Sequence, residues 1–212
     1  VNNLNTGRRI LAQAGAIDAA LAFGGGPPNT GATESWNGSN WTEVNDLNSG
    51  RNFLAGTGTQ TAALAIGGPS TTADTEYWNG TNWTEVNNLN TGRQISGQGA
   101  GTQTSSLVAG GGPPTGALTE TFNGTNWTEV NDLNTARDHL GVTGADNTSA
   151  LAFGGEAPPP KSLTESWNGS NWTETADMAT ARHYLGGAGT TTAGLAVGGD
   201  PNLTSTEEFT SA

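Results

Sequence analysis

The sequence predicts an all-β fold, a β-propeller with five blades, and three observations lead to that prediction. One unit recurs five times in 212 residues, each copy opening at an arginine and the arginines lying 42 to 45 residues apart: Arg8, Arg51, Arg93, Arg137 and Arg182. Every unit holds several short strand-like segments separated by Gly, Asn and Pro. No segment has helical periodicity of useful length. Repeats of about 40 to 50 residues with several strands each are typical of propellers.

One unit of this size cannot bury its own faces, so the five units are expected to pack into one body. We therefore predict that residues 1–212 form a single domain, with units that begin near the five arginines.

The second unit shows how each blade is expected to divide into four antiparallel strands. Strand a is predicted at residues 52–59, and strand b at 62–66, a run of small apolar residues before a Gly-Gly pair that suits burial on both faces. Strand c is predicted at 75–78 and strand d at 83–89. Between c and d stands Asn79-Gly80, a strong hairpin signal because both residues tolerate the positive φ of a tight primed turn.

The two ends of the chain predict how the ring closes. Residues 1–4 align with residues 44–47, the end of strand d, and residues 206–209 align with residues 33–36, strand c. We expect the N-terminal strand, from Val1 to Leu4, to complete the last blade and so to remove exposed strand edges. The wrap-around unit lacks the turn with Trp-Thr-Glu, so this closure is expected to be the weak point of the fold.

The repeated residues resemble the Kelch repeat. Kelch units carry an Arg before strand a, a Gly-Gly after strand b, an aromatic at the end of strand c and a Trp at the start of strand d. In the second unit these positions are held by Arg51, Gly67-Gly68, Trp78 and Trp83. The wording Trp-Asn-Gly-x-Asn-Trp-Thr-Glu, at residues 36–43, 78–85 and 167–174, is also similar to repeats in proteins of marine phages and bacteria. The Kelch resemblance implies a propeller and little about function, because propellers serve many functions.

Composition narrows the classes of function. With 19 acidic and 7 basic residues the formal net charge is −12, which disfavours nucleic acid and anionic membranes as partners. The chain has no Cys, so it has no thiolate nucleophile, disulfide or Cys-based metal site, and it lacks the Cys-modified Tyr on which Kelch-like oxidases depend. The only histidines, His139 and His183, have no evident Ser–His–Asp set, and no ligand spacing supports a metal site with Asp138. We expect a monomer with no catalytic residues, metal or cofactor.

Two recurrent sets of residues are expected to be structural. The seven Trp residues could form a row of sugar-stacking rings, but their recurrence in register favours packing between blades. The five arginines are expected to be paired with recurrent glutamates, because a buried charge needs a partner. The sequence leaves open which glutamates these are: those of strand c (34, 76, 120, 165, 207) or those of strand d (43, 85, 129, 174).

The copies differ at the two positions after each Arg and in the b–c loop. In an antiparallel four-stranded blade the d–a and b–c connections emerge on the same side, so both sets should surround one mouth of the channel. A constant frame with varied loops on one face is typical of binding scaffolds, although unconstrained drift would also vary these loops. The candidate ligand-binding residues are Arg9, Asn52, Phe53, Gln94, Asp138, His139, His183 and Tyr184.

The sequence thus predicts a non-enzymatic binding module that recognises a glycan or a surface protein at this channel-mouth face. The alternative is a module without a ligand, either a structural component of a virion or a designed or reconstructed repeat scaffold. An enzyme is the third, more distant class. Localisation does not follow from the sequence, although the phage-like wording would suit a virion or an extracellular place.

Overall fold

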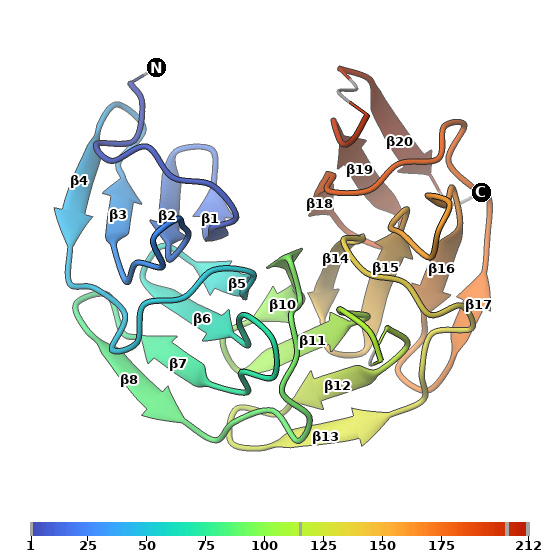
Figure 1. Ribbon diagram of the computed structural model, residues 1–212, viewed down its shortest axis with the longest axis horizontal. Helices are drawn as coiled ribbons and strands as arrows, with labels where there is room; N and C mark the ends of the chain where they lie inside the picture. The colour runs from blue at the N-terminus through green and yellow to red at the C-terminus, as the bar shows by residue number, and fades with distance from the viewer. Residues whose placement is uncertain (1, 115, 202–203, 211–212) are drawn as a thin grey trace.

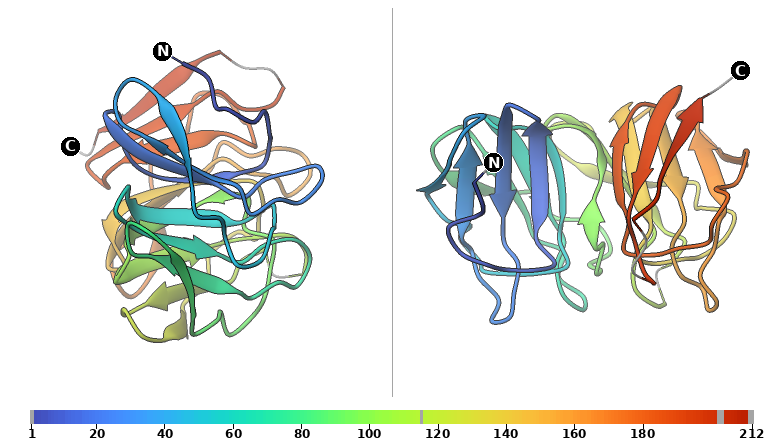
Figure 2. Two further views of the ribbon diagram at one scale, coloured as in Figure 1. Left: turned by 90° about the vertical axis from the view of Figure 1, so that its left-hand side faces the viewer. Right: turned by 90° about the horizontal axis from the view of Figure 1, so that it is seen from above.

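The computed structural model describes residues 2–114, 116–201 and 204–210, and shows five β-sheets arranged as the blades of a propeller (Figure 1). The described ranges contain no helix, and hence none that is long and apolar enough to cross a membrane. The innermost strand of each sheet faces the common axis, and the outermost lies at the rim (Figures 1 and 2). The predicted all-β, five-bladed propeller is confirmed.

The strands follow one another from the axis to the rim in each blade, and neighbours in a blade are antiparallel, apart from one short added strand beside blade 2. Blades 1 and 2 consist of β1 (Ala12–Ala16), β2 (Ala19–Phe23), β3 (Thr33–Trp36), β4 (Trp41–Val44), β5 (Ala55–Thr59), β6 (Ala62–Ile66), β7 (Thr75–Trp78) and β8 (Trp83–Val86). Blade 3 consists of β10 (Ala100–Thr102), β11 (Ser105–Ala109), β12 (Thr119–Phe122) and β13 (Trp127–Val130). Blades 4 and 5 consist of β14 (Gly141–Asp146), β15 (Ser149–Phe153), β16 (Thr164–Trp167), β17 (Trp172–Glu174), β18 (Gly186–Gly189), β19 (Ala193–Val197) and β20 (Thr206–Thr210).

The predicted bounds of the second unit hold for its two middle strands, and the outer two are shorter than predicted. Strand b and strand c have the predicted limits, but β5 begins at residue 55 rather than 52, and β8 ends at 86 rather than 89. Phe53 has a φ of 54°, which is incompatible with an extended strand. After β8 the chain turns inward, because the Leu89 N–H donates to the Ala73 carbonyl at 3.0 Å.

Unit 3 has an additional short strand beside the axis. β9 (Gly97–Gln98) pairs in parallel with β5 of blade 2, so the innermost segment of this unit is divided between two blades. The Gln98 side chain crosses the axis to blade 5, where its Nε2 donates to the Gly187 carbonyl at 2.8 Å and its Oε1 accepts the Gly187 N–H at 2.6 Å.

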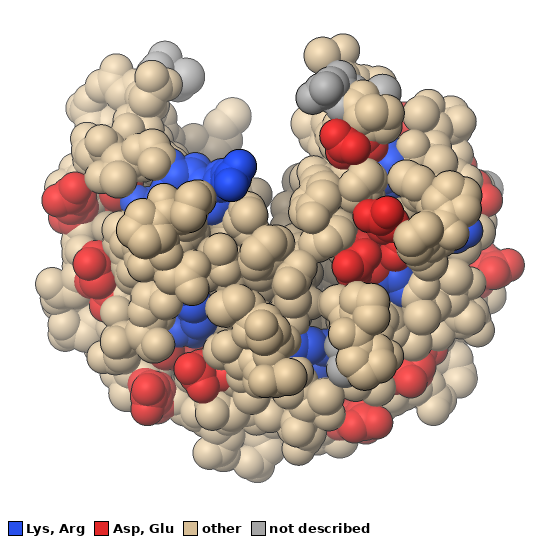
Figure 3. Space-filling model, in the orientation of Figure 1, with Lys and Arg blue, Asp and Glu red and all other residues tan. Residues whose placement is uncertain are grey.

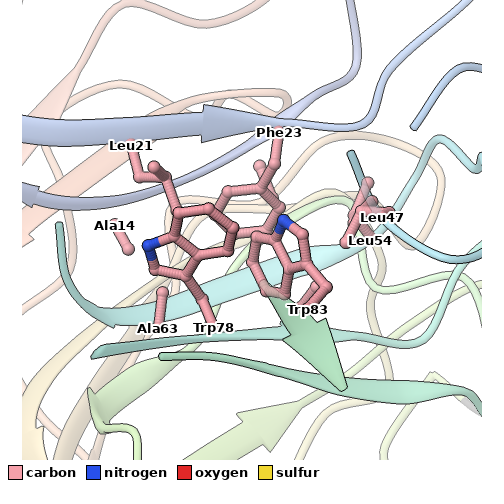
Figure 4. Packing of buried hydrophobic residues seen from close by; sticks show 10 residues of the cluster. Ala14, Leu21, Phe23, Leu47, Leu54, Ala63, Trp78 and Trp83 are labelled. Carbon is pink, nitrogen blue, oxygen red and sulfur yellow. The ribbon is translucent and has the colours of Figure 1, made fainter. Parts of the chain in front are cut away.

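The core lies between the blades, where the tryptophans of strand d pack against the preceding blade. Trp83 contacts Phe23 of blade 1 with ring centroids 4.9 Å apart, and Trp78 lies beside it (Figure 4). The Trp83 indole N–H donates to Thr33 Oγ1 at 3.1 Å. Blades 3 and 4 repeat this bond from Trp127 and Trp172. The predicted packing role is confirmed for six tryptophans, which are buried, whereas Trp41 of blade 1 is only half-buried.

The recurrent arginines pair with the glutamates of strand c, which answers the question that the sequence left open. Arg93 Nη1 lies 2.5 Å from Glu120 Oε1, and both side chains are buried. The second oxygen of Glu120 accepts the Asn90 N–H at 2.8 Å, so the carboxylate ties the d–a connection to strand c. The strand-d glutamates are exposed. The remaining pairs are Arg8–Glu34, Arg51–Glu76, Arg137–Glu165 and Arg182–Glu207.

The c–d turn differs from the tight primed turn that was predicted. Trp78 pairs with Trp83, so four residues lie between the paired positions. Gly80 has a φ of 90°, but Asn79 is not among the residues with positive φ. Asn79 acts through its side chain, whose Oδ1 accepts the N–H groups of Thr81 and Asn82 at 2.9 and 2.8 Å. The turn is therefore a side-chain-capped loop that needs positive φ only at its glycine.

The predicted closure of the ring is wrong for the residues that the structure describes. Blade 5 has three strands, and the described part of the N-terminal segment adds none to it; Val1 lies outside the described residues. In the described chain the ring is open between blades 1 and 5, where Figure 3 shows a cleft, and Figures 1 and 2 show the segment near the N-terminus on the blade 1 side.

Contacts with blade 1 explain where the N-terminal segment lies. The Asn5 N–H donates to Glu34 Oε2 at 2.7 Å, and the Asn5 side chain donates to the Trp41 carbonyl at 3.1 Å. These are the bonds that the d–a connection makes in the next blade, where Asn48 bonds Glu76 and Trp83. Residues 2–8 therefore lie where the end of a preceding blade would lie, but they bring no Trp-Thr-Glu to pair with β20.

Candidate functional site

The position two residues after the opening Arg has a left-handed backbone in four of the five units. Ile10, Phe53, His139 and Tyr184 have φ between 51° and 57°. In unit 3 the residue with positive φ is Ser96, at 62°, one position further along, because Ile95 takes the buried place that Leu54 has in unit 2. Positive φ is unusual for residues with a Cβ, so five such sites at one level mark a constrained feature.

His139 lies at the centre of a cluster to which units 2 to 5 contribute. Its Nδ1 is 2.9 Å from Ser96 Oγ, and its Nε2 is 2.9 Å from the Tyr184 hydroxyl. The His139 and Tyr184 rings stack with centroids 3.9 Å apart, and the Phe53 centroid is 6.4 Å from that of His139. The strained backbone turns of neighbouring units thus bring one side chain each to a common point at the mouth of the channel.

Acidic residues of blades 4 and 5 surround this aromatic cluster. Asp138 Oδ2 lies 3.3 Å from His139 Nε2. His183 Nε2 lies 3.5 Å from Glu156 and 3.8 Å from Asp200, and the buried His183 Nδ1 has no hydrogen-bond partner among the described residues. Figure 3 shows acidic side chains gathered on the right of the cleft and basic ones on its left.

The d–a and b–c connections meet at this face, as predicted. Asp138 pairs with Glu156 through two backbone hydrogen bonds of 2.9 and 2.8 Å, and the Asp200 N–H donates to the His183 carbonyl at 2.8 Å. Glu156 and Asp200 are the residues that follow Gly-Gly in units 4 and 5. The b–c connection therefore lies beside the d–a connection of the same unit, and the two varied segments share one face.

Burial shifts the pKa values of the cluster. It lowers the pKa of His139, opposed by the nearby Asp138 carboxylate, so the neutral imidazole is favoured. It raises the pKa of Asp138, against the attraction of His139. Burial also raises the pKa of Tyr184, and the surrounding carboxylates add to this shift, which keeps the phenol protonated.

The structure brings together five of the eight predicted site residues: Phe53, Asp138, His139, His183 and Tyr184. Arg9, Asn52 and Gln94 lie in the d–a connections, outside that cluster. The Arg9 side chain is exposed and its backbone pairs with Gly26; the Gln94 carbonyl accepts the Gly112 N–H at 3.0 Å.

Three residues of the cluster were not singled out from the sequence: Ser96, Glu156 and Asp200. The b–c loops that contain Glu156 and Asp200 belonged to the predicted face, and their first residues could have been chosen from their register after Gly-Gly. Ser96 had no such signal, because unit 3 shifts its positive-φ residue by one position.

Below the mouth, the innermost strands enclose a central cavity of about 430 Å³. Glycine, alanine and threonine supply most of its lining, and the larger side chains are those of Gln13, Ile17, Leu21, Trp41, Gln98 and Val142. Within the described ranges, no three or more His, Asp or Glu side chains are grouped so that they could hold a metal ion.

No protein-family model matches this chain, and no curated protein matches it. The five-bladed propeller that the Kelch resemblance implies is present, whereas membership of the Kelch family remains a prediction from the repeat wording.

Proposed function

We propose that the protein is a non-enzymatic binding module that recognises a neutral glycan, or a glycan-like polar surface of a protein, at the channel-mouth face. The observation that carries this proposal is the exposed Tyr184 ring stacked on the buried His139. Tyr184 is 54% exposed, one of three exposed large hydrophobic residues in the described chain. An aromatic ring fixed from below and open above offers a rigid apolar face with a polar edge.

The groups around this ring suit a ligand rich in hydroxyl groups. Asp138, Glu156 and Asp200 supply acceptor oxygens within reach of one ligand, and the Tyr184 hydroxyl lies at the same level. A net charge of −12 disfavours an anionic ligand at such a site. A neutral sugar that stacks on Tyr184 and donates to the carboxylates combines these features.

A binding role is favoured over catalysis by the way in which His139 is used. Its two ring nitrogens lie 2.9 Å from the hydroxyls of Ser96 and Tyr184, and burial lowers its pKa. Such a histidine supports the ring above it. A general base would instead need a ring nitrogen directed at a substrate.

The test is a glycan array probed with the purified chain and with three variants. Tyr184→Ala removes the exposed ring, and its exposure makes a loss of folding unexpected. His139→Ala, His183→Ala and Tyr184→Ala combined remove the cluster. Ile17→Ala is the control, because Ile17 is 95% exposed in the a–b turn of blade 1, on the opposite face.

We expect binding that Tyr184→Ala weakens at least tenfold, that the triple change abolishes and that Ile17→Ala leaves unchanged. Binding that survives the triple change in a folded protein would place the ligand elsewhere. If the folded wild-type chain shows no binding on glycan and cell-surface protein arrays, the alternative is favoured: a ligand-free structural component or scaffold.

A further inference from the structure

Blade 5 contains a cavity where the other blades hold a tryptophan. The cavity has a volume of about 260 Å³ and lies between blades 4 and 5, against Phe153, Thr164, Met178, Leu195 and Phe209. Phe153, Met178 and Phe209 correspond in the repeat to Phe23, Leu47 and Trp78, which pack around Trp83 between blades 1 and 2 (Figure 4). The cavity therefore occupies the place of a strand-d tryptophan, for which the described part of blade 5 has no counterpart.

The hydrogen-bond acceptor for that tryptophan is present. Strand-d indoles donate to the first threonine of strand c in the preceding blade, at 3.0 to 3.1 Å, in three pairs: Trp83–Thr33, Trp127–Thr75 and Trp172–Thr119. Thr164 is the next threonine in this series; it is buried, lines the cavity and receives no indole from the described chain.

The backbone edge beside the cavity is also unpaired. β20 is bonded to β19 on one side, and no described strand lies on the other. Thr206 and Glu208 are exposed and Phe209 is half-buried, whereas the corresponding Thr75 and Trp78 of blade 2 are buried. An open edge next to an apolar cavity can accept an added strand, which gains backbone hydrogen bonds and a specificity pocket together.

We propose that blade 5 binds, antiparallel to β20, an extended polypeptide segment with the strand-d sequence of this repeat, Trp-Thr-Glu-Val. Its Trp fills the cavity, donates to Thr164 and lies opposite Phe209, as Trp127 lies opposite Phe122 at 5.0 Å in blade 3. One anchor of the other blades is missing, because Ala179 stands where Asn48, Asn90 and Asn134 donate to the carbonyl of the strand-d Trp.

The test uses the full chain and a labelled peptide copied from residues 124–133, Gly-Thr-Asn-Trp-Thr-Glu-Val-Asn-Asp-Leu, with fluorescence anisotropy as the measurement. We expect saturable binding that replacement of the peptide Trp by Ala weakens at least tenfold. Thr164→Val removes the acceptor at nearly constant volume and should weaken binding about fivefold, the size of one ordinary hydrogen bond. Ala179→Asn restores the missing anchor and should strengthen binding by a similar factor.

Thr119→Val is the matched control, because it removes the same acceptor where the indole of Trp172 already occupies it. It should lower the melting temperature and leave peptide affinity unchanged, whereas Thr164→Val should leave the melting temperature of the free chain nearly unchanged. Absence of binding at millimolar peptide, equal binding of the Ala peptide, or no gain from Ala179→Asn would overturn the proposal. So would a self-associated chain, seen by sedimentation, that the peptide does not dissociate, since a second copy would then cover this face.

Discussion

Arg93 shows how completely a buried charge is partnered in this repeat. Its Nε donates to the Gly110 carbonyl at 3.0 Å, and its Nη1 donates to the Thr91 carbonyl and to Glu120. The guanidinium therefore holds the Gly-Gly segment, the d–a connection and strand c together. A role of this kind explains why an Arg opens every unit.

Arg93→Met tests how much these contacts of Arg93 contribute to the free energy of unfolding. The change leaves the buried Glu120 carboxylate without its cation, and removal of one member of a buried pair costs about 3–5 kcal/mol of unfolding free energy. The measurement is the midpoint of denaturant unfolding. Glu129→Gln in the exposed strand d of the same blade is the control, expected within about 0.5 kcal/mol of wild type. Equal effects of the two changes would contradict the structural role of the pair.

His139 predicts a pH dependence whose sign follows from burial. Burial lowers the pKa of His139 in the folded protein below its ordinary value of 6.5, so the unfolded chain binds this proton more readily. Its contribution to stability is therefore lost as the pH falls below about 6.5. The raised pKa of Asp138 acts in the opposite direction, because the folded protein binds that proton more readily, and His183 and Glu156 also face the cluster.

His139→Gln separates the two contributions. The variant keeps Asp138 and loses the titrating ring, so wild type should lose more unfolding free energy than the variant between pH 7.5 and pH 5.5. Thermal unfolding at several pH values measures the difference. Parallel curves for the two proteins would show that His139 does not titrate differently in the folded and unfolded states.

At the scale of single elements, the c–d turn depends on one glycine. Gly80 has a φ of 90°, yet a Cβ placed there would meet nothing closer than the Thr61 carbonyl oxygen at 3.4 Å. Gly80→Ala should therefore cost about 1–2 kcal/mol from backbone strain alone, without a steric clash. Thr81→Ala in the same exposed turn should be nearly neutral. Chemical denaturation of both variants checks this, and similar stability of the two would contradict a strained backbone at Gly80.

The elements that could be predicted from sequence are those with an internal signal. Strand b and strand c of unit 2 are bounded by an apolar run, Gly-Gly and Asn-Gly, and their limits were correct. The outer strands ended early because of tertiary contacts: the Leu89 N–H bonds to Ala73, and Phe53 adopts a left-handed backbone at the channel mouth. Neither effect is visible in the periodicity of the chain.

At the scale of the whole molecule, the register of the repeat predicted which residues lie together at the channel mouth. It did not predict which strand would close the ring. The positions two residues after the Arg of units 2, 4 and 5 converge because equivalent turns surround one axis, and this brings Phe53, His139 and Tyr184 together. In sequence, residues 1–4 do match residues 44–47 at the end of strand d. This match did not predict on which side of the gap the segment would bind, because that depends on Asn5, Glu34 and Trp41 of blade 1.

The open ring predicts that blade 5 is the least protected part of the fold. β20 has one paired edge among the described strands, and Val197 is 44% exposed. Blade 5 is held to the opposite side of the axis by the side-chain bonds from Gln98 to Gly187 of β18. Amide hydrogen exchange should therefore be faster in β18–β20 than in β5–β7, whose blade has neighbours on both sides.

Gln98→Ala tests how far the two bonds to Gly187 stabilise blade 5. Loss of both bonds to Gly187 should accelerate exchange in β18 and β19 about tenfold, because each lost hydrogen bond is worth about 0.5–1.5 kcal/mol and local opening follows that free energy. Exchange in blade 2 should change much less, apart from β9 and the paired part of β5. Gln103→Ala is the control, since Gln103 bonds blade 2 at the Ala63 and Trp78 carbonyls and leaves blade 5 untouched. Equal protection of blades 2 and 5 in the wild-type chain would mean that blade 5 is as stable without a fourth strand as its neighbours are with one.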